Sequence, residues 1–238
     1  MKKIKDLKIK IFADGANIQD MFSLNKLKFI SGFTTNPSLM SQQNIYDYKT
    51  YARKIIKGIK NKSISFEVTS DSLTEMEKQA QEISNWSENI YVKIPFVNSV
   101  GKKTLPLIKK LSASGMKINV TAIFSHKQAK EVLKILHKNS DVYLSIFAGR
   151  IADTGRDPCE TIAKCVSISK KFKKVKILWA SCRQVFSIFE ANKVGCHIIT
   201  VPHQMIKKFN LLGKSLDKYA IETSRDFYSD SKKINFKV

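Results

Sequence analysis

The stretch Ile90-Tyr91-Val92-Lys93-Ile94-Pro95 places one basic residue inside an apolar run that a proline closes. A short apolar run of this kind, bounded by a breaker, predicts a buried β-strand. A lysine at the end of such a strand meets little water, and burial disfavours its charged form. A neutral amine can attack a carbonyl and form a Schiff base. The alternative is a lysine whose stem packs while its ammonium group reaches solvent.

Similar β-rich runs alternate with longer stretches of helical periodicity along the whole chain. We predict strands at Lys10–Ala13, Phe29–Phe33, Ser65–Thr69, Ile90–Ile94, Lys117–Thr121, Val142–Phe147, Val175–Trp179 and His197–Val201. The helical stretches between them include Asn44–Lys60, which a turn region at Ser38 and Ser41 opens, and Ser72–Asn85, Ser125–Leu136 and Asp157–Phe172. Regular β-α alternation produces parallel strands with right-handed crossovers. About eight such units in 238 residues predict an α/β fold with a single (β/α)8 barrel of the TIM type.

The main alternative to a barrel is a doubly wound open sheet, which needs a glycine-rich turn after its first strand; none follows here. We assign residues 1–210 to the barrel and residues 211–238 to an extra C-terminal segment. Within that segment Leu212–Lys233 has apolar residues at helical spacing. We expect this helix to pack on the barrel of its own chain or on a neighbouring subunit.

Composition favours a soluble, cytoplasmic protein. No apolar run is long enough to span a bilayer, and the basic first residues are not followed by the apolar region of a signal peptide. The four cysteines form no C-x-x-C pair, and no histidine lies at zinc-site spacing from them, so we expect free thiols and no metal site.

The net charge of +22 would suit a nucleic-acid binder, because clustered cations release counterions from phosphates. Nearly all of the excess is lysine, however, and it is spread over most predicted helices without a nucleic-acid-binding motif. We therefore expect a solvated lysine surface with non-specific affinity for polyanions, and neither a specific nucleic-acid partner nor a membrane partner.

In a (β/α)8 barrel the chemistry lies at the C-terminal ends of the strands. Polar residues recur at these predicted ends, and Phe147 and two arginines accompany them: Asp14, Thr34, Asn36, Glu67, Lys93, Asn119, Thr121, Ser145, Phe147, Arg150, Ser181 and Arg183. Helix N-caps explain some polar residues at such positions, and Ser38, Ser125 and Asp157 are candidates. Capping cannot explain Asn119 and Lys93, because both lie inside apolar strands.

Six segments at these strand ends resemble the motifs of the transaldolase family. They are Phe12–Asp14, Thr34–Leu39, Val92–Pro95, Asn119–Thr121, Phe147–Ile151 with Asp153 and Gly155 beyond it, and Ala180–Arg183. The resemblance covers nearly the whole chain. It implies a (β/α)8 barrel without metal or organic cofactor. It also implies Schiff-base transfer of a dihydroxyacetone unit from sedoheptulose 7-phosphate or fructose 6-phosphate to an aldose phosphate.

The resemblance and the chemistry of the side chains together give each residue a role. Lys93 would form the Schiff base, and Asp14 would take the proton from the C4 hydroxyl so that the C3–C4 bond breaks. Glu67 and Thr121 would hold a catalytic water; the alternative for Glu67 is an ion pair with a lysine inside the barrel mouth.

Two further groups of residues would bind the substrate. Thr34, Asn36, Asn119 and Ser145 would hydrogen-bond the hydroxyls of the three-carbon unit, with local backbone bonding as the alternative, which suits Thr34 better than Asn119. Arg150 and Arg183 would bind the phosphate, which fits the planar fork of arginine, and Ser181 would donate to it.

Close relatives of the transaldolases are aldolases that release free dihydroxyacetone from fructose 6-phosphate. These resemble the chain in length, as do the small microbial transaldolases, but have glutamine in place of Glu67 and tyrosine in place of Phe147. Glu67, Ser145 and Phe147 here match the transferase pattern, whereas Ala148 and Cys182 depart from the usual residues. Two alternatives to a transaldolase therefore stay open: a fructose 6-phosphate aldolase or a transferase for another sugar phosphate, and a barrel that binds polyanions with an idle lysine. A ring-like homo-oligomer is also expected.

Overall fold

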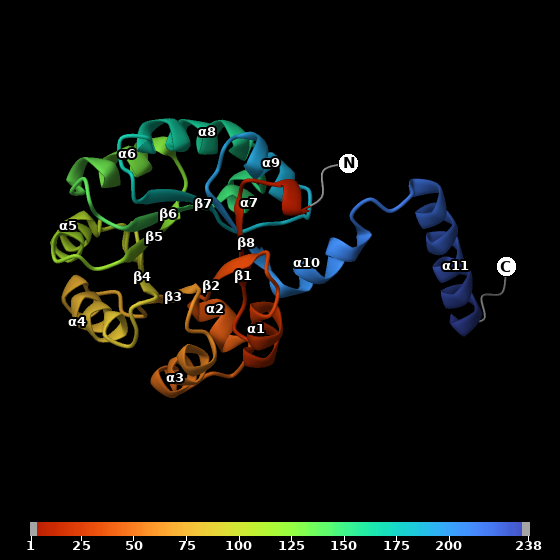
Figure 1. The fold of residues 1–238 in the computed structure, drawn as a ribbon, viewed down its shortest axis with the longest axis horizontal. Coiled ribbons are helices and arrows are strands. Elements are labelled where there is room, and N and C mark those ends of the chain that lie inside the picture. Colours follow the sequence, from red (N-terminus) through yellow and green to blue (C-terminus); the bar gives the residue numbers. More distant parts are fainter. Residues whose placement is uncertain (1–3, 235–238) are drawn as a thin grey trace.

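The computed structural model describes residues 4–234, and its eight parallel strands form the predicted closed barrel. Each strand pairs with the next along the chain, and β8 pairs with β1 to close the ring. Helices surround the strands on the outside (Figure 1). The strands are β1 (Lys10–Asp14), β2 (Ile30–Thr34), β3 (Ser63–Glu67), β4 (Ile90–Pro95), β5 (Ile118–Ile123), β6 (Val142–Ile146), β7 (Val175–Trp179) and β8 (Ile198–Pro202).

The helices follow the strands in alternation, with extra short helices after β2, β6 and β8. They are α1 (Ile18–Asn25), α2 (Pro37–Ser41), α3 (Tyr48–Gly58), α4 (Leu73–Ser84), α5 (Leu105–Ala113), α6 (His126–Ile135), α7 (Ala148–Ala152), α8 (Pro158–Ser169), α9 (Ser187–Lys193), α10 (His203–Lys207) and α11 (Leu216–Ile234). Short 3-10 turns cover Ile4–Asp6 and Lys208–Leu211. The turn region predicted at Ser38 and Ser41 is a helix, and the helix predicted from Asn44 begins only at Tyr48.

Helix starts follow the side chains that can satisfy their free N–H groups. Ser125 forms a capping box with Gln128 at the start of α6, and Asp157 accepts from the N–H of Cys159 at the start of α8, as predicted. The prediction of Ser38 as a cap is wrong. Asn36 caps α2 instead, because Pro37 suits the first helical position and leaves the preceding residue to accept.

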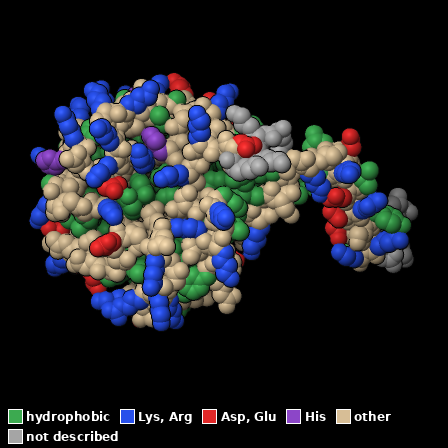
Figure 2. All heavy atoms as spheres, in the orientation of Figure 1, with side chains coloured by type: hydrophobic (Ala, Val, Ile, Leu, Met, Phe, Trp, Pro, Cys, Tyr) green, Lys and Arg blue, Asp and Glu red, His purple; other side chains and the backbone are tan. Residues whose placement is uncertain are grey.

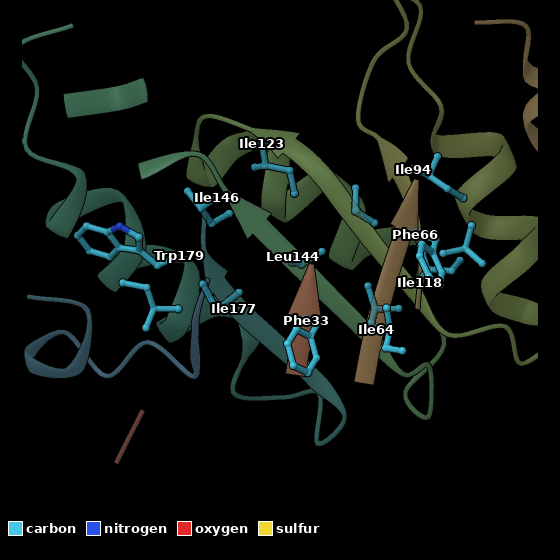
Figure 3. Close-up of a cluster of buried hydrophobic side chains, with 14 of the residues drawn as sticks. Phe33, Ile64, Phe66, Ile94, Ile118, Ile123, Leu144, Ile146, Ile177 and Trp179 are labelled. Carbon is cyan, nitrogen blue, oxygen red and sulfur yellow. The ribbon is translucent and has the colours of Figure 1, made fainter. Parts of the chain in front are cut away.

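Two hydrophobic layers result from the alternation of side chains along each strand. The outer layer lies between strands and helices and includes Phe66 and Ile94, both fully buried (Figure 3). Burying one such side chain stabilises the fold by about 1.5–3 kcal/mol. The inner layer lies inside the ring of strands and consists of Phe12, Tyr91, Tyr143, Leu178, Ala180 and Ile198.

Strand β3 runs from Ser63 to Glu67, two residues earlier than predicted. Ser63 pairs with Gly32 of β2 and Ile64 with Ile90 of β4, so both neighbouring strands extend β3 toward its amino-terminal side. The last pair is Glu67 with Lys93. The shift therefore makes Glu67 the last residue of the strand and places its carboxylate at the mouth of the barrel.

The last helix, α11, stands clear of the barrel and is joined to it by residues 208–215 (Figure 1). None of its side chains is buried, and Leu216, Phe227 and Ile234 are each more than 60% exposed. Neither α11 nor any other helix within residues 4–234 has the length and apolar content to cross a membrane.

Candidate active site

A pocket of about 600 Å³ opens at the C-terminal ends of the strands. The predicted site residues that line it are Asp14, Thr34, Asn36, Glu67, Lys93, Thr121, Ser145, Phe147, Arg150, Ser181 and Arg183. Only Asn119 of the predicted set lies outside the lining. Residues from six strands and from the loops after them thus meet in one cavity, as expected for this fold.

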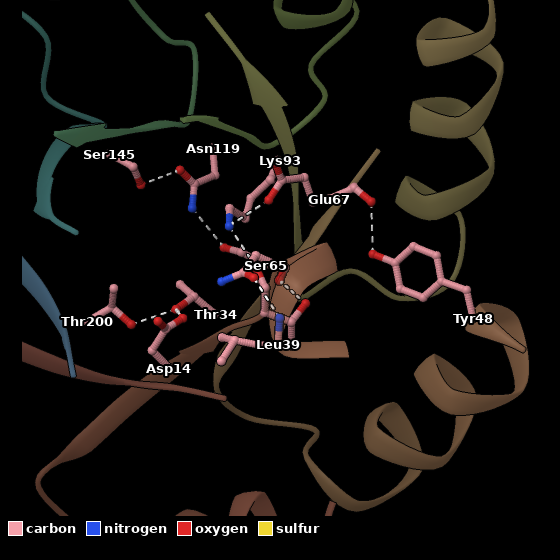
Figure 4. Close-up of polar contacts among 12 residues, drawn as sticks. Asp14, Thr34, Leu39, Tyr48, Ser65, Glu67, Lys93, Asn119, Ser145 and Thr200 are labelled. Carbon is pink, nitrogen blue, oxygen red and sulfur yellow. Dashed lines mark hydrogen bonds and ion pairs between the residues drawn. The ribbon is translucent and has the colours of Figure 1, made fainter. Parts of the chain in front are cut away.

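Lys93 lies on the wall of this pocket near the end of β4 and is only 6% exposed. Its Nζ donates to the carbonyl oxygen of Thr35 at 2.7 Å and lies 2.9 Å from Oε2 of Glu67 (Figure 4). The alternative in which the ammonium group reaches solvent is therefore excluded. Two of the three Nζ donor directions are occupied, so the amine is held in a fixed position facing the cavity.

Glu67 forms the ion pair with a lysine that the sequence left open as its alternative role. Its carboxylate is more exposed than Lys93, and the hydroxyl of Tyr48 donates to its backbone carbonyl at 3.0 Å. The carboxylate is thus a proton acceptor in direct contact with the amine. Its role in holding a water stays a prediction.

Asp14 ends β1, and its Oδ1 accepts a hydrogen bond from Thr34 at 2.6 Å. Because the single proton of Thr34 Oγ1 is used there, Thr200 must donate to Thr34 across their 2.5 Å contact. Burial raises the pKa of Asp14, although Lys93 and the bond from Thr34 oppose this change. A carboxylate whose pKa is raised is a stronger base toward a substrate hydroxyl.

Asn119 lies beneath the pocket and is fully buried. Its Nδ2 donates to Ser65 at 3.1 Å, and its Oδ1 accepts from the hydroxyl of Ser145 at 2.7 Å. Neither the amide nitrogen nor the amide oxygen of Asn119 bonds to the local backbone. The sequence had indicated that local bonding was a poor explanation for this residue. The amide orients Ser145, which does line the pocket, so Asn119 acts here through its neighbour.

Local backbone bonding, the alternative to substrate binding, is found for Asn36 and not for Thr34, for which it was plausible. The Oδ1 of Asn36 accepts from the N–H of Leu39, so this residue has the local backbone bond. The Thr34 hydroxyl bonds instead to the side chains of Asp14 on the adjacent strand β1 and Thr200 on β8, the strand on the other side of β1. The amide nitrogen of Asn36 is the part of that side chain left for a ligand.

Thr121 has a buried hydroxyl without a hydrogen-bond partner among the described residues. The next residue, Ala122, adopts φ 55°, and the register between β5 and β6 shifts at this point. Left-handed backbone at a residue other than glycine costs about 1–3 kcal/mol and is common at functional sites. An unpaired buried hydroxyl beside a pocket is suited to hold a water or a substrate group.

Two arginines stand at the outer rim of the pocket, and both are exposed. The guanidinium of Arg150 lies 5.6 Å from the ring centre of Phe147, and Arg183 pairs with Asp153 at 2.7 Å. Ser181 lies beside them with φ 60°. A phosphate at this rim would meet two cations and one hydroxyl.

The loops that carry these groups approach each other closely at Gly149. A Cβ atom added there would lie 1.6 Å from the carbonyl oxygen of Ser181. Only glycine permits this contact, which fixes the start of α7 against the loop after β7.

Two residues of the site were missed by sequence reasoning, Thr200 and Ser65. Each is a single hydroxyl inside an apolar strand, and such residues usually satisfy themselves locally. Their positions in the strands could have identified them, because side chains two residues apart on a strand face the same side. Ser65 lies two residues before Glu67, and Thr200 lies opposite Phe12, which is two residues before Asp14.

Comparison with known proteins supports the family suggested by the motifs. The sequence model of the family described as Transaldolase/Fructose-6-phosphate aldolase matches residues 11–237. A protein of Dehalococcoides mccartyi named "Probable transaldolase" is 36% identical over 199 residues, which are 83% of this chain and 88% of the relative. One of the same name from Nitrosopumilus maritimus is 33% identical over 230 residues, with 95% and 96% covered.

Among solved structures, the crystal structure of KGPDC from Streptococcus mutans aligns with a TM-score of 0.54 at 7% identity. The alignment covers 82% of this chain and 88% of that one, and at this identity it shows the fold alone. The family match and the two relatives go further, because they extend over the strand ends that build the pocket. The chain belongs to the transaldolase/fructose-6-phosphate aldolase family and is an enzyme of the aldolase and transaldolase type.

Proposed function

We propose that this enzyme is a transaldolase, which moves a dihydroxyacetone unit from a ketose phosphate to an aldose phosphate through a Schiff base on Lys93. The observation that carries the proposal is the buried Lys93 amine, which lies in the pocket against the Glu67 carboxylate. An amine in this setting is positioned to attack a carbonyl that enters from the rim.

The first step needs a neutral amine. Glu67 is the carboxylate in contact with Lys93 Nζ, at 2.9 Å, and a carboxylate in this position can take the proton as the ketose C2 carbonyl is attacked. The carbinolamine then loses water and leaves an iminium ion. Thr121, whose hydroxyl is unpaired among the described residues, lies where it can hold that water.

Cleavage needs a base for the C4 hydroxyl, and Asp14 has the required surroundings. Its raised pKa makes it a better proton acceptor, and Thr34 and Thr200 fix its orientation. When Asp14 takes the C4 proton, the C3–C4 bond breaks and its electrons move into the iminium, which becomes an enamine. The aldose phosphate leaves, and an acceptor aldehyde reverses the sequence.

Transfer rather than release depends on how long the enamine survives. Phe147 lines the pocket and packs against Phe124 and Arg150, and it has no hydroxyl that could donate a proton. The enamine therefore waits for an acceptor. This side chain favours the transferase over the fructose 6-phosphate aldolase, which is the second candidate.

The deciding experiment measures glyceraldehyde 3-phosphate released from fructose 6-phosphate, with and without erythrose 4-phosphate. Release only with the acceptor supports the transaldolase. Equal release without it supports the aldolase, and no release in either case means another sugar phosphate or an inactive barrel.

The covalent step has its own test. Borohydride added with fructose 6-phosphate should attach the sugar to Lys93, as shown by peptide mass spectrometry. Lys93→Ala should abolish the label, whereas Lys109→Ala, which changes an exposed lysine, should leave it intact. Labelling that persists in Lys93→Ala rules out this Schiff base.

A further inference from the structure

A second cavity, here called the amino-terminal cavity, opens at the opposite end of the barrel where the strands begin. Its volume is about 790 Å³, within the range of small-molecule sites. Residues at the starts of the strands and in the segments just before them line it, and none of the predicted catalytic or substrate-binding residues does. It is therefore separate from the candidate active site.

The lining of the amino-terminal cavity is strongly cationic. Five lysines contribute to it: Lys8, Lys10, Lys173, Lys174 and Lys176. The ion pairs found within residues 4–234 involve none of these five. The cavity also has one carboxylate, Asp141, which accepts a hydrogen bond from the hydroxyl of Tyr91 at 2.8 Å.

Three of the polar groups in the lining are held in place by the backbone. The Oδ1 of Asn192 accepts from the N–H groups of Lys8 and Ile9, at 2.9 and 3.3 Å, which leaves its amide nitrogen to donate. The Nζ of Lys176 donates to the carbonyl of Lys173 at 3.0 Å. Of the five lysines, Lys176 is thus held by a contact with the backbone, whereas the other four are exposed side chains around the cavity.

His197 is the third such group. Its Nδ1 accepts from the N–H of Ile177 at 2.9 Å, so the neutral ring carries its proton on Nε2. Burial, with a smaller contribution from Lys176, lowers the pKa of His197 and keeps the ring neutral at pH 7. His197 thus offers one further N–H donor.

The innermost part of the cavity is aromatic and rigid. The rings of Tyr91 and Tyr143 stack with centroids 3.8 Å apart and planes 12° from parallel, and each residue is 8% exposed. The edge of Phe12 packs on Tyr143. An apolar floor lowers the local dielectric, which strengthens the attraction between the lysines and an anion.

We propose that the amino-terminal cavity binds a small polyanion that carries two or more phosphate groups. Lysine ammonium groups bind phosphate oxygens as point charges, and five of them at one cavity exceed what a single phosphate needs. The limited volume of about 790 Å³ favours a small molecule over a nucleic-acid strand, which needs a continuous groove. The proposal does not depend on the reaction catalysed at the other end.

The test uses inorganic tripolyphosphate and isothermal titration calorimetry at about 150 mM NaCl, which screens diffuse attraction beyond about 8 Å. The protein is Arg150→Ala/Arg183→Ala, so that the rim of the active pocket no longer competes. We expect one tripolyphosphate per chain, and affinity for orthophosphate weaker by at least about tenfold.

The effect of replacing two lysines of the cavity is then compared with the effect of replacing two lysines on the outer helices. Adding Lys10→Gln/Lys176→Gln should lower the affinity for tripolyphosphate by at least about tenfold, whereas Lys57→Gln/Lys109→Gln on exposed helix surfaces should change it by less than about twofold. Lys8→Gln/Lys174→Gln, at two exposed positions, gives a second cavity variant if the first does not fold.

Three outcomes would overturn the proposal. Equal losses in the cavity and control variants would mean diffuse attraction to the cationic surface. Loss of all binding in Arg150→Ala/Arg183→Ala alone would place the anion in the active pocket. Equal affinity for orthophosphate and tripolyphosphate would remove the requirement for several phosphate groups.

Discussion

Asp14 is held in surroundings that disfavour its charged form, and this has a consequence for stability. A carboxyl whose pKa is raised by folding adds stability only at low pH, and that contribution is lost as the pH rises through the folded-state pKa. The ionised form of Asp14 therefore lowers the stability of the fold. The base that we propose for cleavage is thus destabilising in its charged form, a common relation at active sites.

Asp14→Asn should accordingly raise the melting temperature at pH 7 and lower kcat by at least about a hundredfold, because the amide cannot act as a base. The gain in melting temperature should shrink as the pH falls, because an increasing fraction of the wild-type carboxyl is then protonated and uncharged as well. Calorimetric melting from pH 4 to pH 8 measures the first effect and coupled-enzyme assays the second.

Two controls define this prediction. Borohydride should still trap the sugar on Lys93 in Asp14→Asn, since the Schiff base forms before cleavage. Asp47→Asn, which changes an exposed N-cap whose pKa is lowered by hydrogen bonds from Thr50, should destabilise the protein instead. A lower melting temperature for Asp14→Asn at pH 7 would contradict the argument.

Phe147→Tyr tests what keeps the enamine from protonation. A hydroxyl at the edge of this ring would supply a proton donor in the pocket, so we expect acceptor-independent release of glyceraldehyde 3-phosphate to rise at least about tenfold. Phe124→Tyr, on the ring that packs beside it, is the matched control. Unchanged release in Phe147→Tyr would show that protonation is limited elsewhere.

At the scale of single residues, the sequence predicted the lining of the pocket better than the network beneath it. Lys93 and Asp14 are informative because charged residues are rare at the ends of buried strands. Thr200 and Ser65 were missed because a hydroxyl in a strand has common local explanations. The bond that makes each of them important joins strands far apart in the sequence.

Among the elements, the contact between α7 and the loop after β7 is the most tightly fitted. Gly149→Ala would force a methyl group to within 1.6 Å of the Ser181 carbonyl oxygen, so the loop must move. We expect a loss of at least about 2 kcal/mol in the free energy of unfolding and a higher KM for phosphorylated sugars, because Ser181 and Arg183 move with the loop.

Gly101→Ala separates this clash from ordinary glycine effects. Gly101 has φ 80° with open space around its Cα, so alanine there should cost only about 1 kcal/mol from backbone strain. Urea unfolding measures both variants. Equal losses, with an unchanged KM in Gly149→Ala, would show that the loop adjusts freely.

The helix α11 has an apolar stripe that the barrel of its own chain does not cover. Leu216, Phe227 and Ile234 lie on one face at helical spacing and are exposed. A single helix of this kind is marginally stable without a packed face, so we expect it to pack on a second copy of the chain.

Phe227→Asp should then lower the molar mass seen by light scattering, while Arg225→Asp on the opposite face should not. The same molar mass in Phe227→Asp and in the unchanged protein would leave the stripe without a role in assembly. Sequence periodicity predicted this helix, but periodicity cannot say which surface covers it.

At the scale of the whole molecule, the lysine surface is the dominant electrostatic feature. Figure 2 shows lysine and arginine side chains spread over the visible face of the barrel, with few acidic ones among them. Like charges at this density repel one another and destabilise the compact state. Raising NaCl from about 10 to 500 mM should therefore raise the melting temperature by roughly 2–5 °C.

Sodium chloride is the appropriate salt because phosphate and sulfate would also compete for the proposed anion sites. The same series in a neutral solute such as glucose serves as the control for general solute effects. A melting temperature that falls with NaCl would mean that ion pairs such as Lys103 with Glu131 outweigh the repulsion.

The overall fold was predictable because its determinants are local. Each strand–helix unit can be recognised from its own hydrophobic periodicity, and eight such units are the number in a closed (β/α)8 barrel. The strand ends were harder to predict: β3 begins two residues earlier than predicted because Ser63 pairs with β2 and Ile64 with β4. Element boundaries depend on partners that a single sequence does not display.

The two hydrophobic layers make the barrel evolvable in a particular way. On β4, Val92 and Ile94 face the helices, whereas Tyr91 and Lys93 face the lumen. Substitutions on the lumen side can alter the reaction without disturbing the packing that specifies the fold. Exchanging Glu67 or Phe147 would change the chemistry available to the enamine and leave Phe66 and its neighbours in place. Selection for a new substrate and selection for folding can therefore act on alternate residues of the same strands.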